Sequence, residues 1–90
     1  MKVSSNEIRS RLDLLGFLED CPDVGDRESL RDAMVLDSLR LGELVAKLEA
    51  DFGIRVSTSE LLPQNFDTIE AIVRFVSARS VVVPISAARA

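Results

Sequence analysis

The sequence has no histidine, tryptophan or tyrosine and a single cysteine, Cys21. Without an imidazole, no residue can take the proton from a serine or cysteine nucleophile in the usual hydrolase arrangement. Zinc, haem and iron–sulfur sites depend on histidine or on several cysteines. A lone cysteine also cannot form an internal disulfide. We therefore expect no catalytic residues and no metal site, and most enzyme classes are excluded.

An excess of positive charge and long apolar runs are also missing. The chain has 15 acidic and 11 basic residues and a net charge of −4, which would repel nucleic acid. Its first residues lack the apolar run of a signal peptide, and no stretch approaches the ~18 apolar residues of a membrane span. We expect a cytoplasmic, monomeric protein that does not bind nucleic acid and does not span a membrane. Basic surfaces of other proteins are the partners that the charge favours.

What is present is an aliphatic chain of 90 residues, 47% hydrophobic with only four phenylalanines, which is the length of one domain. Four segments have helical periodicity, and no alternating pattern is long enough for a sheet. The fold class is therefore all-α, a small four-helix bundle. The first helix would open with a capping box, Ser4-Ser5-Asn6-Glu7, and Gly16 would weaken it slightly. Its apolar face would consist of Ile8, Leu12, Leu15 and Leu18.

The second helix has two distinct faces. It should begin at Asp37 or Ser38, both favoured capping residues, and end before Gly53. A wedge of about 100° would face the core; it contains Leu41, Leu44, Val45, Leu48 and Phe52. The opposite side would carry Leu39, Gly42, Ala46 and Ala50, flanked by Glu43. This outward face is partly apolar, whereas an ordinary surface helix would have lysine and glutamate there.

The other segments are shorter or irregular. Residues 19–36 form a long polar connection, in which Leu30 and Met34 should anchor to the core. A short third helix should follow the second capping box at residues 57–60 and be stopped by Pro63. The last helix should begin with Asp67 as its cap, and its apolar face would be Ile69, Ile72, Val73 and Val76. Residues 1–80 would form the domain, and residues 81–90 a tail.

A serine or aspartate at a helix start is ordinarily a cap and nothing more. Here Asp37-Ser38-Leu39 is followed by a spaced set of residues, which are Glu43-Leu44-Val45, Leu48-Glu49, Phe52 and Ile54-x-Val56. With these gaps, residues 6–79 resemble the acyl and peptidyl carrier proteins, the phosphopantetheine-binding family. The resemblance implies the acyl-carrier type of four-helix bundle, with a long loop between helices 1 and 2 and a short third helix.

The resemblance also implies a function. Ser38 would be the attachment point of 4′-phosphopantetheine, which a phosphopantetheinyl transferase moves from coenzyme A, and the cofactor's thiol would hold cargo as a thioester. Partner recognition would involve Asp37, Leu39, Gly42, Glu43, Ala46 and Glu49. Arg40 and Lys47 depart from a fully acidic helix and suggest a narrower set of partners. The carrier itself would need no general acid or base, which accounts for the missing histidine.

The subtype is indicated by two segments. Residues 30–36 lack the run of an acidic residue, leucine and glycine that precedes the serine in fatty-acid carriers, and Asn65-Phe66 lies just before the last helix. Both features look more like discrete D-alanyl, aminoacyl, glyceryl or methoxymalonyl carriers of secondary-metabolite or cell-surface pathways. Their partners would be an adenylate-forming ligase, or another loading enzyme, and a downstream acyltransferase or synthase. The alternatives are a fatty-acid-type carrier and a helical interaction module without a prosthetic group.

Overall fold

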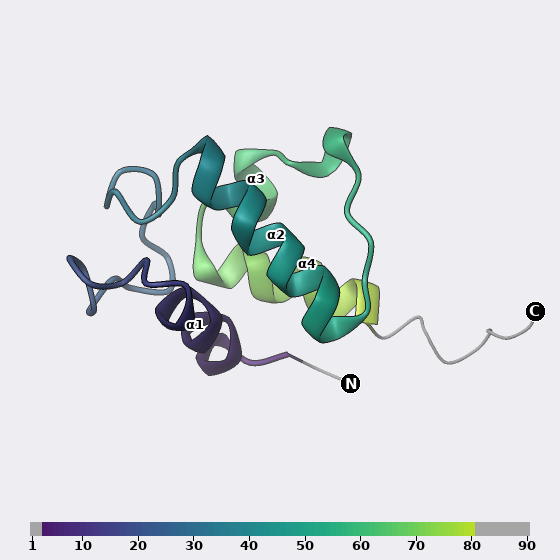
Figure 1. Cartoon of the computed structure of the whole chain (residues 1–90), viewed down its shortest axis with the longest axis horizontal. Coiled ribbons are helices and arrows are strands. Elements are labelled where there is room, and N and C mark those ends of the chain that lie inside the picture. The colour runs from purple at the N-terminus through teal and green to yellow at the C-terminus, as the bar shows by residue number, and fades with distance from the viewer. Residues whose placement is uncertain (1–2, 81–90) are drawn as a thin grey trace, which may run out of the picture.

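Residues 3–80 are described by a computed structural model, and the predicted tail at 81–90 lies outside them. The described residues form helices α1 (Ser5–Leu14), α2 (Ser38–Phe52), α3 (Pro63–Phe66) and α4 (Ile69–Ser80), with a 3₁₀ turn η1 (Thr58–Glu60) before α3. Figure 1 shows α2 lying in front of α4, with α1 below both and the short α3 above. The prediction of an all-α fold with a long first loop and a short third helix is confirmed.

α1 begins at the predicted capping box, and Ser4 is its N-cap residue. The Ser4 hydroxyl accepts a hydrogen bond from the Glu7 N–H at 3.3 Å, and the Glu7 carboxylate accepts one from the Ser4 N–H at 2.9 Å. Each side chain thereby satisfies an amide that the first turn leaves without a helical acceptor. Ile8 and Leu12 are fully buried from this helix.

The predicted end of α1 is wrong. The helix stops at Leu14, and Gly16 terminates it rather than weakening its interior. Gly16 has a φ of 82°, and the Phe17 N–H donates to the Leu12 carbonyl at 2.9 Å across it, which closes the last turn. Leu18 is buried as expected, but from the segment after the helix.

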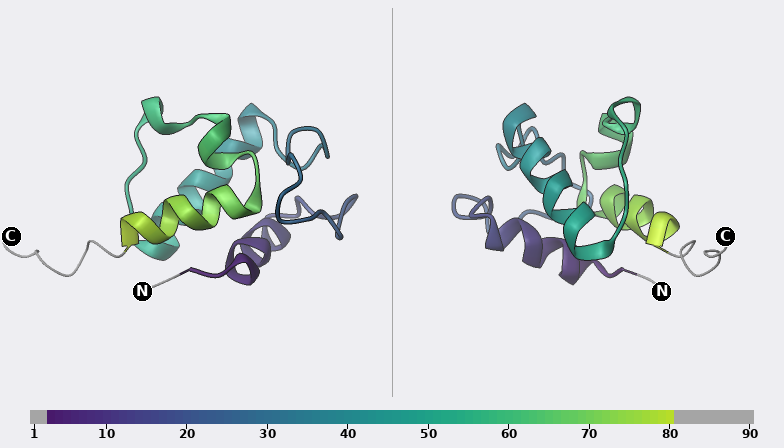
Figure 2. Two further views of the ribbon diagram at one scale, coloured as in Figure 1. Left: turned by 180° about the vertical axis from the view of Figure 1, so that it is seen from behind. Right: turned by 45° about the vertical axis from the view of Figure 1, so that its right-hand side comes forward.

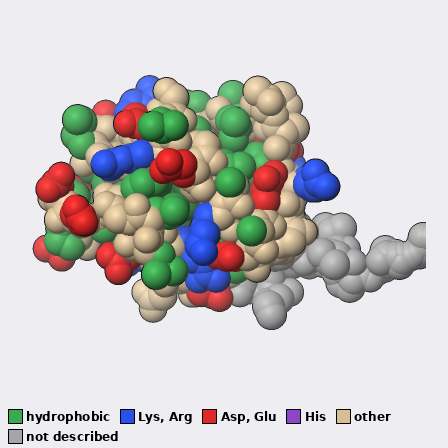
Figure 3. Space-filling model, in the orientation of Figure 1, with side chains coloured by type: hydrophobic (Ala, Val, Ile, Leu, Met, Phe, Trp, Pro, Cys, Tyr) green, Lys and Arg blue, Asp and Glu red, His purple; other side chains and the backbone are tan. Residues whose placement is uncertain are grey.

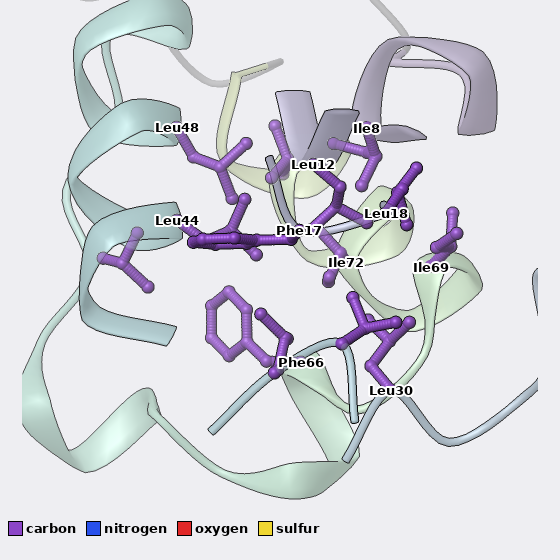
Figure 4. Close-up of a cluster of buried hydrophobic side chains, with 14 of the residues drawn as sticks. Ile8, Leu12, Phe17, Leu18, Leu30, Leu44, Leu48, Phe66, Ile69 and Ile72 are labelled. Atoms are coloured by element: carbon purple, nitrogen blue, oxygen red, sulfur yellow. The ribbon is translucent and has the colours of Figure 1, made fainter. Parts of the chain in front are cut away.

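The core-facing side of α2 is as predicted. Leu44 and Leu48 have no exposed surface, Val45 is buried, and Leu41 and Phe52 pack against the core from its edge. These side chains meet those of α1, α4 and the long connection in a single apolar cluster (Figure 4). No polar or charged residue among the described residues is buried. Removal of apolar surface from water is therefore the main stabilising contribution to this core.

The long connection is tied to the start of α4. The Leu30 N–H donates to the Asp67 carbonyl at 2.6 Å, and the Glu70 N–H donates to the Asp26 carbonyl at 2.9 Å. Asp26 also pairs with Arg9 of α1 at 2.6 Å. Leu30 is fully buried, as predicted. These bonds fix the segment that leads into α2, which forms turns but no helix of its own.

Two expectations about the second half of the chain are corrected. Pro63 begins α3 instead of stopping a helix, because proline fits the first helical position, where its missing N–H is not needed. At α4 the capping side chain is that of Thr68, which accepts from the Ala71 N–H at 3.0 Å. The Asp67 carboxylate accepts instead from the Arg31 N–H at 3.1 Å and thus holds the long connection.

α1 packs against both α2 and α4, and α3 packs against α4. The views in Figure 2 show that α2 and the segment from η1 to α3 lie on the same side of α4. This arrangement leaves the N-terminal end of α2 at the surface, between the long connection and α3.

Candidate functional site

Asp37 and Ser38 lie where the long connection enters α2. Asp37 is the N-cap residue: it has extended backbone angles, and its carboxylate accepts a hydrogen bond from the Arg40 N–H at 2.8 Å. Its carbonyl accepts from the Leu41 N–H, also at 2.8 Å. Capping is therefore done by Asp37, and the Ser38 side chain is not needed for it.

Ser38 is the first residue of α2, and its side chain is exposed. No hydrogen bond within residues 3–80 involves its hydroxyl. The hydroxyl lies at the positive end of the α2 dipole, where the first amides of a helix have no helical acceptor. A negatively charged group attached to this oxygen would be stabilised by those amides.

A groove runs from Ser38 toward α3. It has a volume of about 360 Å³ and is lined by Leu36, Leu41, Leu61 and Phe66, with Ser38 among the residues at its border. The groove opens to solvent and has a mostly apolar lining. Leu61 and Phe66 were not predicted as site residues, because only the packing of the η1–α3 segment opposite α2 brings them to Ser38.

The outward face of α2 is exposed as predicted. Leu39 is 73% exposed, and Gly42, Glu43 and Ala46 are also exposed. A β-carbon added to Gly42 would meet no atom within 4 Å. Glycine inside a helix is less stable than alanine by about 0.5–1 kcal/mol, and no packing within the described residues requires it at Gly42.

Glu49, like Asp37, differs from the other predicted recognition residues because its carboxylate has an intramolecular partner. Its carboxylate accepts a hydrogen bond from the Val56 N–H at 2.9 Å and so ties the segment after α2 back to that helix. It is also partly buried. A role of Glu49 in partner recognition stays a prediction, and the structure adds a stabilising role to it.

The two basic residues of α2 are engaged within the molecule. The Arg40 guanidinium lies over the Phe17 ring, with its central carbon 5.0 Å from the ring centroid. Lys47 lies 3.6 Å from the Asp51 carboxylate. Figure 3 shows acidic, basic and apolar side chains interspersed over the face that α2 occupies. The charge of Arg40 is therefore directed inward rather than toward a partner.

Asp51 has a second and closer partner on α1. Arg11 donates to its carboxylate at 2.8 Å. This hydrogen bond is the main cause that lowers the pKa of the Asp51 carboxyl below its ordinary value of 3.8; burial opposes it, and the Lys47 charge assists it. The bond joins the end of α2 to α1.

The described residues contain no group of three or more carboxylate, thiol or imidazole side chains that could hold a metal ion. None of the described helices is long and apolar enough to cross a membrane.

The family model for the phosphopantetheine attachment site matches residues 9–76. The chain belongs to this family. The D-alanyl carrier protein of Streptococcus uberis is 46% identical over 57 residues, which are 63% of this chain and 71% of that protein. The D-alanyl carrier protein of Streptococcus thermophilus (strain LMD-9) is 44% identical over 61 residues, 68% and 76% of the two chains. No solved structure matches the chain.

Members of this family hold 4′-phosphopantetheine covalently and carry intermediates without catalysing their conversion, so the chain is a non-catalytic carrier protein. The residues present fit this cofactor. An exposed serine hydroxyl without a partner among residues 3–80 lies at a helix N-terminus, where a phosphodiester is favoured. The adjoining groove offers apolar surface for the arm.

Proposed function

We propose that Ser38 carries the 4′-phosphopantetheine and that the carrier is charged with D-alanine or a similarly small amino acid. The observation that supports the attachment point most directly is the exposed Ser38 hydroxyl, which the Asp37 cap leaves without a structural task. The thiol at the end of the bound cofactor supplies the thioester chemistry.

The reactivity of Ser38 is explained by its position. A transferase must bring the β-phosphate of coenzyme A to the hydroxyl oxygen, which requires access from solvent. The Ser38 oxygen displaces the nucleotide, so that a phosphodiester forms and the serine proton leaves with a base of the transferase. Asp37 stays hydrogen-bonded to the Arg40 N–H, so the carboxylate beside the hydroxyl has a fixed orientation.

Small cargo is supported by the relatives and by the shape of the site. The relatives from Streptococcus uberis and Streptococcus thermophilus are named D-alanyl carrier proteins. The groove beside Ser38 is open, whereas the core below it is filled by Leu44, Leu48 and Ile72, which have no exposed surface. Interiors packed in this way have no room for a long acyl chain without rearrangement.

The partners follow from this function. A phosphopantetheinyl transferase modifies the carrier, an adenylate-forming ligase loads the amino acid with ATP, and a downstream acyltransferase receives it in a cell-surface or specialised biosynthetic pathway. Tethering the cargo raises its local concentration at each partner to roughly the millimolar range. The predicted recognition residues Asp37, Leu39, Gly42, Glu43 and Ala46 lie on the exposed side of α2, around or beyond Ser38.

The attachment point is tested by intact-mass measurement after incubation with coenzyme A and a phosphopantetheinyl transferase. We expect the wild-type chain to gain one 4′-phosphopantetheine and Ser38→Ala to gain none. Ser10→Ala removes an exposed serine of α1 and should be modified like the wild type. A wild-type chain that gains no mass would instead support the helical interaction module without a prosthetic group.

The cargo is tested on the modified carrier with a D-alanine-activating, adenylate-forming ligase, and separately with a fatty-acyl ligase. We expect a D-alanyl thioester, which is seen as a mass gain reversed by hydroxylamine. Loading with long fatty acyl chains and with no amino acid or short hydroxyacyl unit would contradict the proposed cargo and favour a fatty-acid-type carrier.

A further inference from the structure

Three residues between positions 3 and 80 have left-handed backbone angles, namely Gly16 with a φ of 82°, Gly53 with 66° and Met34 with 63°. Gly16 and Gly53 end α1 and α2, which is the usual place of such a glycine. Met34 has the same backbone conformation without being glycine. For a residue with a β-carbon this conformation is strained.

The backbone around Met34 repeats the pattern found at Gly16. The Met34 N–H donates to the Arg31 carbonyl at 3.0 Å, and the Val35 N–H donates to the Leu30 carbonyl at 2.8 Å. Leu30 and Val35 are both buried, as the apolar pair that accompanies this helix-ending motif usually is. Every feature of the motif is present except the glycine, so the fold alone would favour glycine at position 34.

The Met34 side chain does not offset this strain by burial in the core. It is 81% exposed, whereas its apolar character in a polar segment predicted an anchor of the long connection in the core. That expectation is wrong, because the left-handed angles at Met34 turn the side chain outward and leave Leu30 and Val35 as the anchors. Strained residues persist where the surrounding structure imposes them, and they concentrate at functional sites.

Arg40 holds Met34 close to the attachment point. Its guanidinium donates to the carbonyls of Met34 and Val35 at 3.4 and 3.3 Å while it lies over the Phe17 ring. Because Arg40 belongs to the first turn of α2, these bonds fix Met34 relative to Ser38. Arg40 is thus a positioning residue, which explains why a basic residue is present in this helix and points inward.

Met34, Leu39 and Leu62 form a set of exposed apolar residues in the segments that adjoin Ser38 along the chain or across the groove. Leu39, the residue after Ser38, is 73% exposed, and Leu62 of the groove is 41% exposed. The exposed charged residues that adjoin this set along the chain are Arg31, Asp32 and Asp37, so its border has a net negative charge. An apolar centre with an acidic border is complementary to an apolar pocket bordered by lysine or arginine.

We propose that Met34 is a docking residue for the ligase that loads this carrier, and that it inserts into an apolar pocket bordered by basic residues on that enzyme. The inference rests on the proposed function, because the ligase must approach Ser38. An unbranched thioether adapts its shape to a pocket more readily than other apolar side chains do.

The test compares loading kinetics of phosphopantetheinylated Met34 variants with the D-alanine-activating ligase. Met34→Gly and Met34→Asn suit the left-handed backbone but remove the apolar side chain. We expect both to raise the KM for the carrier about tenfold with kcat little changed, since burial of one such side chain commonly contributes that much to binding. Met34→Leu should stay within about twofold of the wild type, because it retains the apolar surface.

Two measurements separate docking from a folding defect. Met34→Gly should unfold at the same or a higher urea concentration than the wild type, because it relieves the backbone strain. Leu14→Ala removes a side chain of α1 that is 70% exposed and should leave the KM unchanged. Unchanged KM values for Met34→Gly and Met34→Asn would overturn the inference. It would also be overturned if the transferase modified these variants less efficiently by the same factor as the ligase loads them. A modified wild-type chain that the ligase does not load at all would overturn the proposed function and this inference with it.

Discussion

Neighbouring residues at the start of α2 have separate tasks. Asp37 caps the helix through the Arg40 N–H, and Ser38 presents a hydroxyl that the described part of the chain does not use. Either residue type could have capped the helix. Because Asp37 is the N-cap residue, Ser38 is the first residue of α2, and its side chain is exposed to solvent.

Replacing Asp37 distinguishes its capping role from a role in recognition. Asp37→Ala should lower the free energy of unfolding by about 1 kcal/mol, because the Arg40 N–H loses its acceptor. Asp37→Asn keeps a capping oxygen without the charge and should remain within a few tenths of a kcal/mol of the wild type. Urea denaturation measures both. If Asp37→Asn is stable but is modified slowly, the transferase recognises the negative charge of Asp37. Equal stability of the wild type, Asp37→Ala and Asp37→Asn would contradict the capping role.

At the scale of the elements, polar contacts at the surface join segments that the apolar core also holds together. Arg11 and Asp51 link α1 to the end of α2. The Arg79 guanidinium of α4 pairs with Glu60 of η1 and donates to the Arg55 carbonyl at 2.9 Å. The second contact fixes the segment before α3 and hence one wall of the groove beside Ser38.

The link between α1 and α2 makes stability depend on pH. The folded-state pKa of Asp51 lies below its ordinary value of 3.8, chiefly because Arg11 hydrogen-bonds to the carboxylate. Its contribution to stability is therefore complete above that value and is lost as the pH falls through the folded-state pKa.

We expect the difference in unfolding free energy between the wild type and Asp51→Asn to be constant near neutral pH and to shrink below about pH 4. Arg11→Gln should show the same behaviour, since it removes the same hydrogen bond. Urea titrations from pH 7 to pH 2 measure this difference. A difference that does not vary with pH in that range would show that Asp51 has no stabilising charge interaction.

On the scale of the whole molecule, α2 has one buried side and one exposed side. Leu44 has no exposed surface and lies in the core that α1, α2, α4 and the long connection share. Leu39 is 73% exposed on the other side. The same residue type in one helix therefore has opposite environments.

Matched alanine variants test this division. Leu44→Ala should lower the free energy of unfolding by about 2–5 kcal/mol through lost burial and a residual cavity. Leu39→Ala should change it by less than about 0.5 kcal/mol, yet raise the KM of the loading ligase if Leu39 contacts partners as predicted. Urea denaturation and loading kinetics provide the two measurements. Loss of stability in Leu39→Ala, or unchanged loading, would contradict this assignment of the outward face.

Local pattern was enough to predict much of this molecule. Helical spacing of apolar residues predicted the first, second and last helices and the two faces of α2, because periodicity is a property of neighbouring residues. The short third helix was predicted from a capping box and placed before Pro63, whereas α3 begins at Pro63. The gaps that follow Asp37-Ser38-Leu39 indicated the carrier family, which the comparisons confirm. Ser38 as the attachment residue follows from the same gaps and stays a proposal.

Contacts between distant segments decided the rest. The groove depends on Leu61 and Phe66 reaching the start of α2, and the inward direction of Arg40 depends on Phe17. Met34 has the spacing of a core residue, but hydrogen bonds of the folded connection impose a left-handed backbone that turns its side chain to solvent. Spacing along a chain specifies a face only within a regular element, and in an irregular connection the direction of each side chain is set by the backbone angles that packing imposes.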